Sequence, residues 1–102
     1  MKFLAVTACP TGIAHTYIAA ESIQRACEKA GVECKVETQG IIGVENEITE
    51  EDIRSADAVI LTTDKPIKNV SRFDNLRKLE IGVGAAIKQP DEIVAEMLSK
   101  FQ

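Results

Sequence analysis

Two short runs of the sequence are rich in apolar and β-prone residues and show almost no alternation of polar and apolar positions. They are residues 2–8 (KFLAVTA) and residues 58–63 (AVILTT). A strand with one face in solvent alternates, whereas a strand buried on both faces does not. Strands of the second kind occur mostly in parallel sheets with helices on both faces. These two runs therefore predict the α/β class.

The segment between these runs predicts a helix, a strand and a loop. From about Thr16 to Ala30 the apolar residues recur at helical spacing, and Gly31 follows as a C-terminal stop. Residues 32–38 alternate, which predicts an outer, half-exposed strand with Glu37 on its polar side. Gly40 and Gly43 then predict a loop.

The second half of the chain continues the same alternation of elements. Thr49 and Asp52 have the spacing of a capping box, which predicts a short helix to about Ser55. A helical turn is expected near residues 70–73, a short strand over 78–83, and a last helix from Pro90. This order predicts right-handed crossovers. We expect residues 1–102 to form a single doubly wound, Rossmann-like domain, with a four-stranded parallel sheet and helices on both faces.

The composition excludes several classes of protein. Hydrophobic residues make up 45% of the chain, enough for a core, and the net charge is -4 without a cluster of Lys and Arg. Nucleic acid is therefore not expected as a partner. No apolar run approaches the length of a membrane span or signal peptide, which predicts a cytoplasmic domain. Three cysteines without CxxC spacing argue against a disulfide framework or zinc site, and we expect neither metal nor cofactor.

The loop after the first strand carries the chemically reactive residues. In open parallel sheets the ligand site lies at the carboxyl ends of the strands. Backbone N–H groups from Thr11 to Thr16, at the positive end of a helix, predict a nest for an anion the size of a phosphate. Cys9 is a nucleophile at this nest, and the same positive helix end stabilises a thiolate there. Gly12 permits close backbone approach, and Pro10 stiffens the turn.

Other residues have simpler interpretations. Cys27 faces the core side of the predicted helix and Cys34 lies on the alternating strand, so both are expected to be small buried hydrophobes. His15, the single histidine, is either a proton carrier or phosphate donor, or a residue that only fills the helix start. Tyr17 and residues 39–44 are interpreted as packing and turn residues.

The string Cys9-Pro10-Thr11-Gly12-Ile13-Ala14-His15-Thr16 resembles the signature of the fructose-type enzyme IIB domains. These domains belong to the bacterial phosphoenolpyruvate-dependent sugar phosphotransferase system. The segments VECKVETQG, IIGVEN and SADAVILTTD also stand where that family has them, so the resemblance covers the whole chain.

This resemblance implies a function and a set of partners. Cys9 would be a phosphocysteine, and the loop from Pro10 to Thr16 would hold the phosphoryl group. The donor would be a phosphohistidine on enzyme IIA, and the acceptor a sugar, fructose or fructose-like, bound in the membrane enzyme IIC. The domain would work at the inner face of the membrane, docked to or fused with enzyme IIC.

Three alternatives share this loop. Low-molecular-weight tyrosine phosphatases have the pattern C-x5-R-[ST], and the spacing from Cys9 to Thr16 is the same. Here His15 replaces the arginine, which removes a bidentate phosphate clamp, and Asp64 is the candidate general acid. Arsenate reductases add resolving cysteines, but Cys27 and Cys34 lie on elements that are expected to point away. A regulatory module in which phosphorylation of Cys9 only alters binding would have an identical loop.

Overall fold

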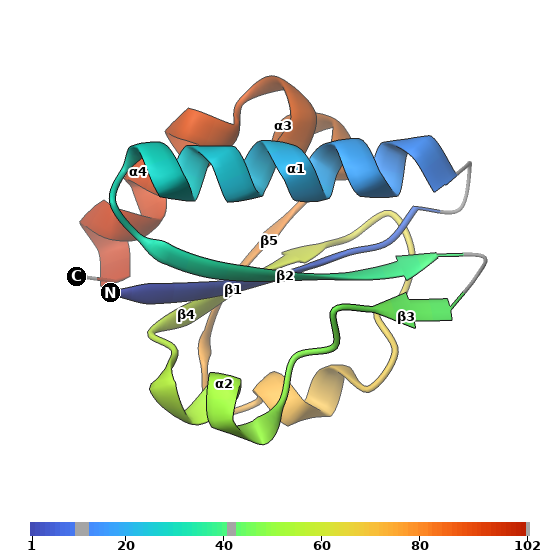
Figure 1. The fold of residues 1–102 in the computed structure, drawn as a ribbon, viewed down its shortest axis with the longest axis horizontal. Helices are drawn as coiled ribbons and strands as arrows, with labels where there is room; N and C mark the ends of the chain where they lie inside the picture. The colour runs from blue at the N-terminus through green and yellow to red at the C-terminus, as the bar shows by residue number, and fades with distance from the viewer. Residues whose placement is uncertain (10–12, 41–42, 102) are drawn as a thin grey trace.

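The computed structural model describes residues 1–9, 13–40 and 43–101 and shows a twisted five-stranded sheet of order β3-β2-β1-β4-β5 (Figure 1). The elements in chain order are β1 (Lys2–Thr7), α1 (Ile13–Lys29), β2 (Glu33–Gly40), β3 (Gly43–Glu45), α2 (Glu50–Ser55), β4 (Ala58–Thr62), the 3-10 helix η1 (Val70–Phe73), β5 (Arg77–Ile81), α3 (Val83–Lys88) and α4 (Pro90–Phe101). β1, β2, β4 and β5 are parallel, and β3 is antiparallel to β2.

The sheet is buried on both faces, as the two apolar runs predicted. Phe3 and Ala5 of β1 belong to the core under α1, α3 and α4. Leu4 and Val6, which point the other way, belong to a second core with residues of α2 and η1 or adjoining them. All four side chains are fully buried. The expected α/β class with helices on both faces is confirmed.

The expected four-stranded parallel sheet is wrong, because the sheet has a fifth, antiparallel strand. β3 pairs with the end of β2, with Gln39 opposite Val44. It is only three residues long and begins at Gly43 with φ 108°, so the sequence has no periodic pattern from which it could be predicted. β3 and the chain beyond it cover the carboxyl half of β2. Glu37, which was expected on the exposed side, is therefore fully buried.

Two element boundaries and one helix also differ from expectation. α1 begins at Ile13 instead of about Thr16, so the predicted loop is shorter. β5 ends at Ile81, and residues 83–88 form α3, which was not predicted. The Asp64 carboxylate accepts a hydrogen bond of 2.6 Å from the Val83 N–H at the start of α3. This capping residue lies 19 positions away, so the local sequence does not reveal it.

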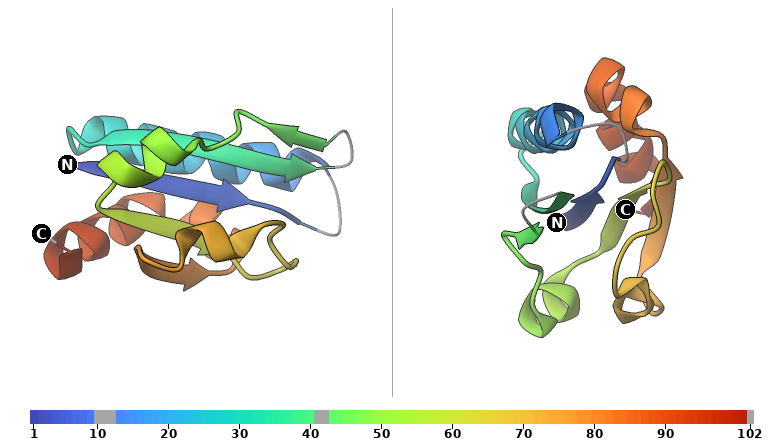
Figure 2. Two further views of the ribbon diagram at one scale, coloured as in Figure 1. Left: turned by 90° about the horizontal axis from the view of Figure 1, so that it is seen from below. Right: turned by 90° about the vertical axis from the view of Figure 1, so that its right-hand side faces the viewer.

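The connections that leave β1 and β4 diverge to opposite faces of the sheet. The chain leaves β1 toward α1 on one face, whereas it leaves β4 toward η1 on the other, as the two views of Figure 2 show. β1 and β4 are direct neighbours in the sheet. Their carboxyl ends therefore form the switch point of the doubly wound sheet, where such folds bind their ligands. Cys9 follows β1 at this point.

Candidate functional site

Cys9 is held in a fixed position at the end of the central strand. It lies two residues beyond Thr7, is half-buried, and packs against the core beneath α1. The preceding residue is tied to β4, because the Ala8 N–H donates to Thr62 Oγ1 at 3.0 Å. The same hydroxyl lies 3.3 Å from the Ala8 carbonyl oxygen. A side chain of the neighbouring strand thus fixes the backbone from which the thiol projects.

His15 lies in the first turn of α1, directly beside this thiol. Its ring is exposed, and Nδ1 is 4.0 Å from Cys9 Sγ. The sequence left open whether His15 belongs to the site or only fills the helix start. The structure brings its ring and Cys9 together.

Of the two threonine residues in the predicted loop, Thr11 and Thr16, the structure describes the surroundings of Thr16. It is 1% exposed, and its carbonyl oxygen accepts a hydrogen bond of 3.0 Å from Thr7 Oγ1. Within residues 1–9, 13–40 and 43–101, its own Oγ1 is buried without a hydrogen-bond partner. A buried polar group in this state costs roughly 1–3 kcal/mol. Such an atom is available to a ligand that reaches it.

The remaining predicted residues divide into two groups. Pro10, Thr11 and Gly12 lie outside the described residues. Ile13 and Ala14 open α1, whose first N–H groups have no acceptor within the helix and carry partial positive charge. The helix-terminus part of the expected anion site is therefore next to Cys9, since His15 of the same turn approaches its sulfur.

Cys27 and Cys34 lie away from Cys9, as expected. Cys27 near the end of α1 is buried, and Cys34 lies opposite Phe3 at the amino end of the sheet. The hydrogen bond between the two thiols, together with burial, raises the pKa of Cys34 far above its ordinary range. Such a thiol is a poor nucleophile at neutral pH. The expected burial is confirmed for Cys27, whereas Cys34 is only half-buried and packs against the same core.

Asp64 and Tyr17 both have structural partners. The Asp64 carboxylate caps α3 through the Val83 N–H, which is a different task from the general acid that a phosphatase needs. The Tyr17 hydroxyl donates to the Glu45 carboxylate and so ties α1 to β3. This hydrogen bond is the largest cause of the raised pKa of Tyr17. The hydrolase alternative therefore lacks both the arginine clamp and an available acid at Asp64.

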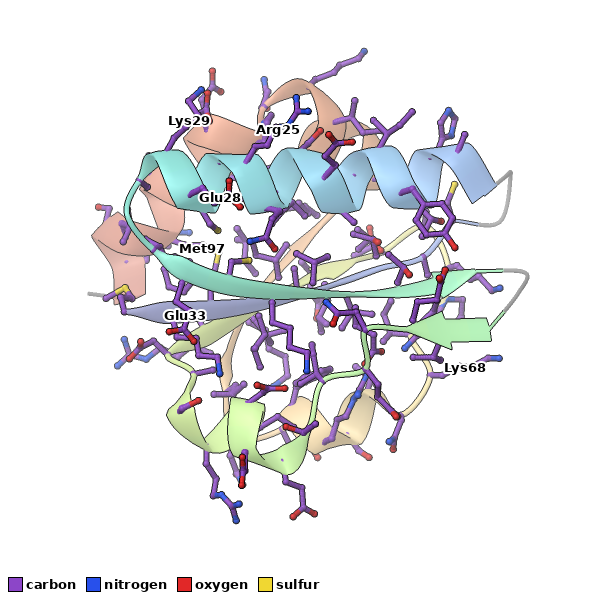
Figure 3. All side chains as sticks on the ribbon, in the orientation of Figure 1. Arg25, Glu28, Lys29, Glu33, Lys68 and Met97 are labelled. Carbon is purple, nitrogen blue, oxygen red and sulfur yellow. The ribbon has the colours of Figure 1, made fainter. Side chains whose placement is uncertain are left out.

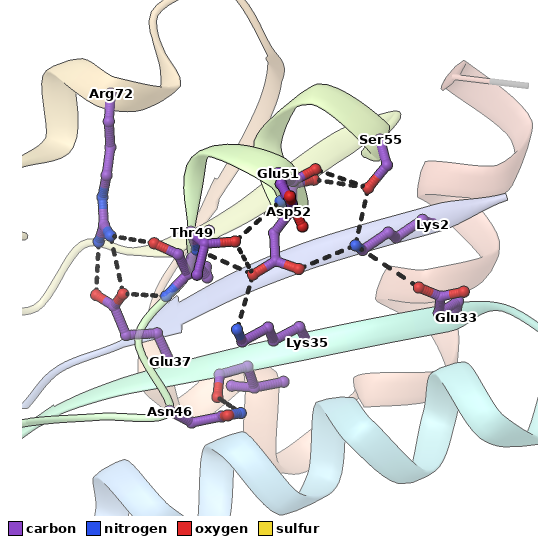
Figure 4. Close-up of polar contacts among 12 residues, drawn as sticks. Lys2, Glu33, Lys35, Glu37, Asn46, Thr49, Glu51, Asp52, Ser55 and Arg72 are labelled. Carbon is purple, nitrogen blue, oxygen red and sulfur yellow. Dashed lines mark hydrogen bonds and ion pairs between the residues drawn. The ribbon is translucent and has the colours of Figure 1, made fainter.

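A buried polar network beneath the sheet was missed in the sequence, because Glu37 was placed on the exposed side of its strand. Arg72 Nη1 and Nη2 donate to the two carboxylate oxygens of Glu37 at 2.9 and 2.5 Å (Figure 4). The Ile48 N–H and Gln39 Nε2 donate at 2.9 and 2.8 Å. Burial by itself raises the pKa of Glu37, but these hydrogen bonds outweigh it and leave the pKa below its usual value. The network joins β2 to η1.

Two further properties bear on cofactors and membranes. Across the described ranges, no three His, Cys, Asp or Glu side chains gather where they would hold a metal ion. Nor does any helix in those ranges combine the length and apolar character needed to span a membrane.

The fold and site together define an α/β domain with a cysteine at the switch point of its sheet, next to the N-terminus of the following helix. Residues 4–96 match the family model described as "PTS system, Lactose/Cellobiose specific IIB subunit". The chain belongs to this IIB family of the sugar phosphotransferase system, and within it to the fructose-like type that the sequence resembles.

Three relatives illustrate this placement. The "PTS system fructose-like EIIB component 2" of Escherichia coli K12 is 50% identical over 96 residues, which cover 94% of this chain and 91% of the relative. The "PTS system fructose-specific EIIABC component" of Bacillus subtilis is 41% identical over 99 residues, 97% of this chain and 15% of that protein. A crystal structure of a domain from the fructose-specific IIABC component of Borrelia burgdorferi is 46% identical, with a TM-score of 0.90, covering 96% of this chain and 93% of that domain.

Proposed function

We propose that the chain carries a phosphoryl group on Cys9 between two components of a sugar phosphotransferase system. The Cys9 thiolate attacks the phosphorus of a phosphohistidine on enzyme IIA. The S–P bond forms as the P–N bond breaks, and the electron pair of that bond stays on the imidazole. A hydroxyl oxygen of a sugar bound in enzyme IIC then attacks the same phosphorus. The S–P bond breaks, Cys9 leaves as a thiolate, and the hydroxyl proton passes to a base.

The observation that carries this proposal is the position of Cys9 at the switch point, with its sulfur 4.0 Å from His15 Nδ1 in the first turn of α1. A stabilised thiolate is both a nucleophile and a leaving group, and both transfers require that combination. Charge on three phosphoryl oxygens needs donors that are already in place. The first N–H groups of α1 supply them, together with the Thr16 hydroxyl, which has no hydrogen-bond partner among the described residues.

The relatives support the choice of partners and substrate. The Bacillus subtilis protein is named as an EIIABC component, so the equivalent domain there shares a chain with A and C parts. The names of the relatives specify fructose or a fructose-like sugar. We therefore assign enzyme IIA as donor, enzyme IIC with a fructose-like sugar as acceptor, and the cytoplasmic side of the membrane as the place of work.

Phosphoryl transfer from purified, phosphorylated enzyme IIA tests the proposal directly. The intact protein should gain the mass of one phosphoryl group, and peptide mapping should place it on Cys9. Cys9→Ser should fold and remain unlabelled, whereas Cys27→Ser and Cys34→Ser serve as matched controls and should be labelled. Full labelling of Cys9→Ser would refute the assignment.

A second stage separates a carrier from a regulatory module. The labelled protein is mixed with membranes that contain enzyme IIC and with the sugar. Appearance of a sugar phosphate with loss of the label supports the carrier function. Retention of the label in the presence of active enzyme IIC and sugar would instead favour regulation.

A further inference from the structure

Gln39 lies at the end of β2 in a position that the buried network fixes. Glu37 and Gln39 are two residues apart on the strand and so point to the same face, and Gln39 is 5% exposed. Gln39 Nε2 donates to Glu37 Oε2 at 2.8 Å, and Arg72 donates to both oxygens of the same carboxylate. The donor end of the amide is thus turned toward Glu37. Its acceptor end, Oε1, must point toward a different group.

That group is the backbone of Lys68. The Lys68 N–H donates to Gln39 Oε1 at 2.8 Å, and Gln39 Nε2 also donates to the Lys68 carbonyl oxygen at 3.2 Å. In the described part of the chain, the backbone of residues 65–68 makes no other hydrogen bond. This segment connects β4 to η1. It runs from the end of β4 past β1 to Gln39 of β2. The side chain of Gln39 therefore clamps Lys68, two residues before η1, to β2.

The clamped segment lies at the same end of the sheet as Cys9. Thr62, which ends β4 just before it, is the residue that holds Ala8. Figure 3 shows Lys68 at the end of the molecule where β3 and the start of α1 lie, whereas Lys29 and Glu33 lie at the opposite end. A protein that delivers a phosphoryl group to Cys9 must cover this end. Interfaces of ordinary size take roughly 800 Å² from each partner, which reaches well beyond one thiol.

Exposed apolar side chains also gather around this end. Ile18, Val44 and Val70 are 46, 42 and 41% exposed. Ile18 lies three residues after His15, Val44 is paired with Gln39, and Val70 follows Lys68 by two residues. Val44 and Val70 flank the Gln39–Lys68 contact and add apolar area to an interface formed there.

Lys68 places an exposed positive charge at this end of an acidic chain. The nearby carboxylates of Glu37, Glu45 and Asp64 are engaged by Arg72, by Tyr17 and by the start of α3. Lys65 and Glu80 both line a shallow hollow of about 250 Å³. Lys68 is exposed and, within the described ranges, has no ion pair. It is an exposed cation that a phosphorylated donor meets when it covers this side.

We propose, on the basis of the function above, that the docking surface for phosphorylated enzyme IIA extends across the end of the sheet to Lys68 and Val70. Gln39 is the positioning residue for that part of the surface. It touches neither the donor nor the phosphoryl group and acts by holding the Lys68 backbone. The clamp thus links a buried network to recognition of the phosphoryl donor.

A double-mutant cycle tests this proposal. Initial rates of phosphoryl uptake from phosphorylated enzyme IIA give kcat and KM for the unmodified chain, Gln39→Leu, Lys68→Gln and the double variant. Lys88→Gln, which removes an exposed lysine at the end of α3, is the matched control. Each test variant should raise KM about threefold with kcat unchanged, the size expected for loss of one surface charge contact. Added salt should shrink the effect of Lys68→Gln.

The double variant decides whether Gln39 acts through Lys68. Because removal of the clamp already displaces the lysine, the double variant should also show about a threefold rise, whereas independent effects would multiply to about ninefold. Hydrogen exchange at the Lys68 amide should accelerate in Gln39→Leu and not in Lys68→Gln. Multiplying effects, or an unchanged KM in Lys68→Gln, would overturn the inference.

Two further outcomes, a variant that does not fold and a chain that takes up no phosphoryl group, are interpreted separately. If Gln39→Leu does not fold, Lys68→Gln still tests the surface, with Val70→Ser as a second probe, and an unchanged KM in Lys68→Gln would again overturn it. If the unmodified chain takes up no phosphoryl group at all, the proposed function itself is overturned, together with the inference that rests on it.

Discussion

Replacing Arg72 with methionine should destabilise the protein strongly, because it isolates a buried carboxylate. Glu37 is fully buried, and the side chain of Arg72 is 13% exposed. Removing one partner of a buried ion pair costs about 3–5 kcal/mol, since the other charge stays buried without compensation. The cation–π contact of Arg72 with the Phe73 ring, 4.5 Å from the guanidinium carbon to the centroid, is lost as well. A domain of this size has about 5–15 kcal/mol of stability in total.

The pH dependence of this cost identifies its origin. In the unmodified chain the pKa of Glu37 is lowered, so its contribution is present above the unfolded pKa of about 4.3 and is lost as the pH falls. In Arg72→Met, burial dominates and raises the pKa of Glu37. The folded variant then takes up a proton more readily than its unfolded state, and its stability falls as the pH rises. The difference between the two proteins should therefore be largest near pH 7 and shrink below about pH 5.

Urea unfolding followed by far-ultraviolet circular dichroism, at several pH values, measures this difference. Arg54→Met is the matched control, because Arg54 is exposed on α2 and should change the free energy of unfolding by less than about 0.5 kcal/mol. A cost below about 1 kcal/mol for Arg72→Met at pH 7, or a cost independent of pH, would refute this account of the buried network.

Three further predictions concern the site and a second polar cluster. Thr16→Val replaces a buried hydroxyl that has no partner among the residues that the structure describes, so the melting temperature should be unchanged or higher while phosphoryl uptake slows; clear thermal destabilisation would contradict this. The unmodified chain should turn over an aryl phosphate negligibly, and His15→Arg should raise that turnover by restoring the C-x5-R-T pattern; robust hydrolysis by the unmodified chain, abolished by Cys9→Ser, would show that the reaction is hydrolysis. Asp52→Ala removes the capping box with Thr49 and should cost about 1–2 kcal/mol by urea unfolding at pH 7. Asp52 also forms ion pairs with Lys35 and Lys2, and a hydrogen bond from Lys35 is the largest cause of its lowered pKa. The cost should therefore begin to decrease as the pH falls below about 4 and decrease further at lower pH, and a cost that stays constant over that range would count against the ion pairs.

Features with local causes could be predicted from the sequence alone. Residues 2–8 and 58–63 lack alternation because both faces of their strands are buried, and this property is visible in the residues themselves. The capping box at Thr49 and the helix that begins at Pro90 likewise depend on neighbours within a few positions. The place of Cys9 followed from the same logic, because a strand that passes into a helix through a short turn puts that turn at the ligand-binding end of the sheet.

Features that depend on distant partners were decided by the tertiary structure. α3 starts where Asp64 caps it across 19 residues, and the clamp joins Gln39 to Lys68 across 29. Glu37 has the pattern of an exposed residue in an alternating strand, yet Arg72, 35 positions later, makes its burial possible. Local secondary-structure propensity depends only on neighbours along the chain, whereas the burial of a charge depends on which groups the fold brings beside it. The sequence alone therefore determined where Cys9, the proposed nucleophile, lies, and the tertiary structure determined the polar network beside the proposed docking surface.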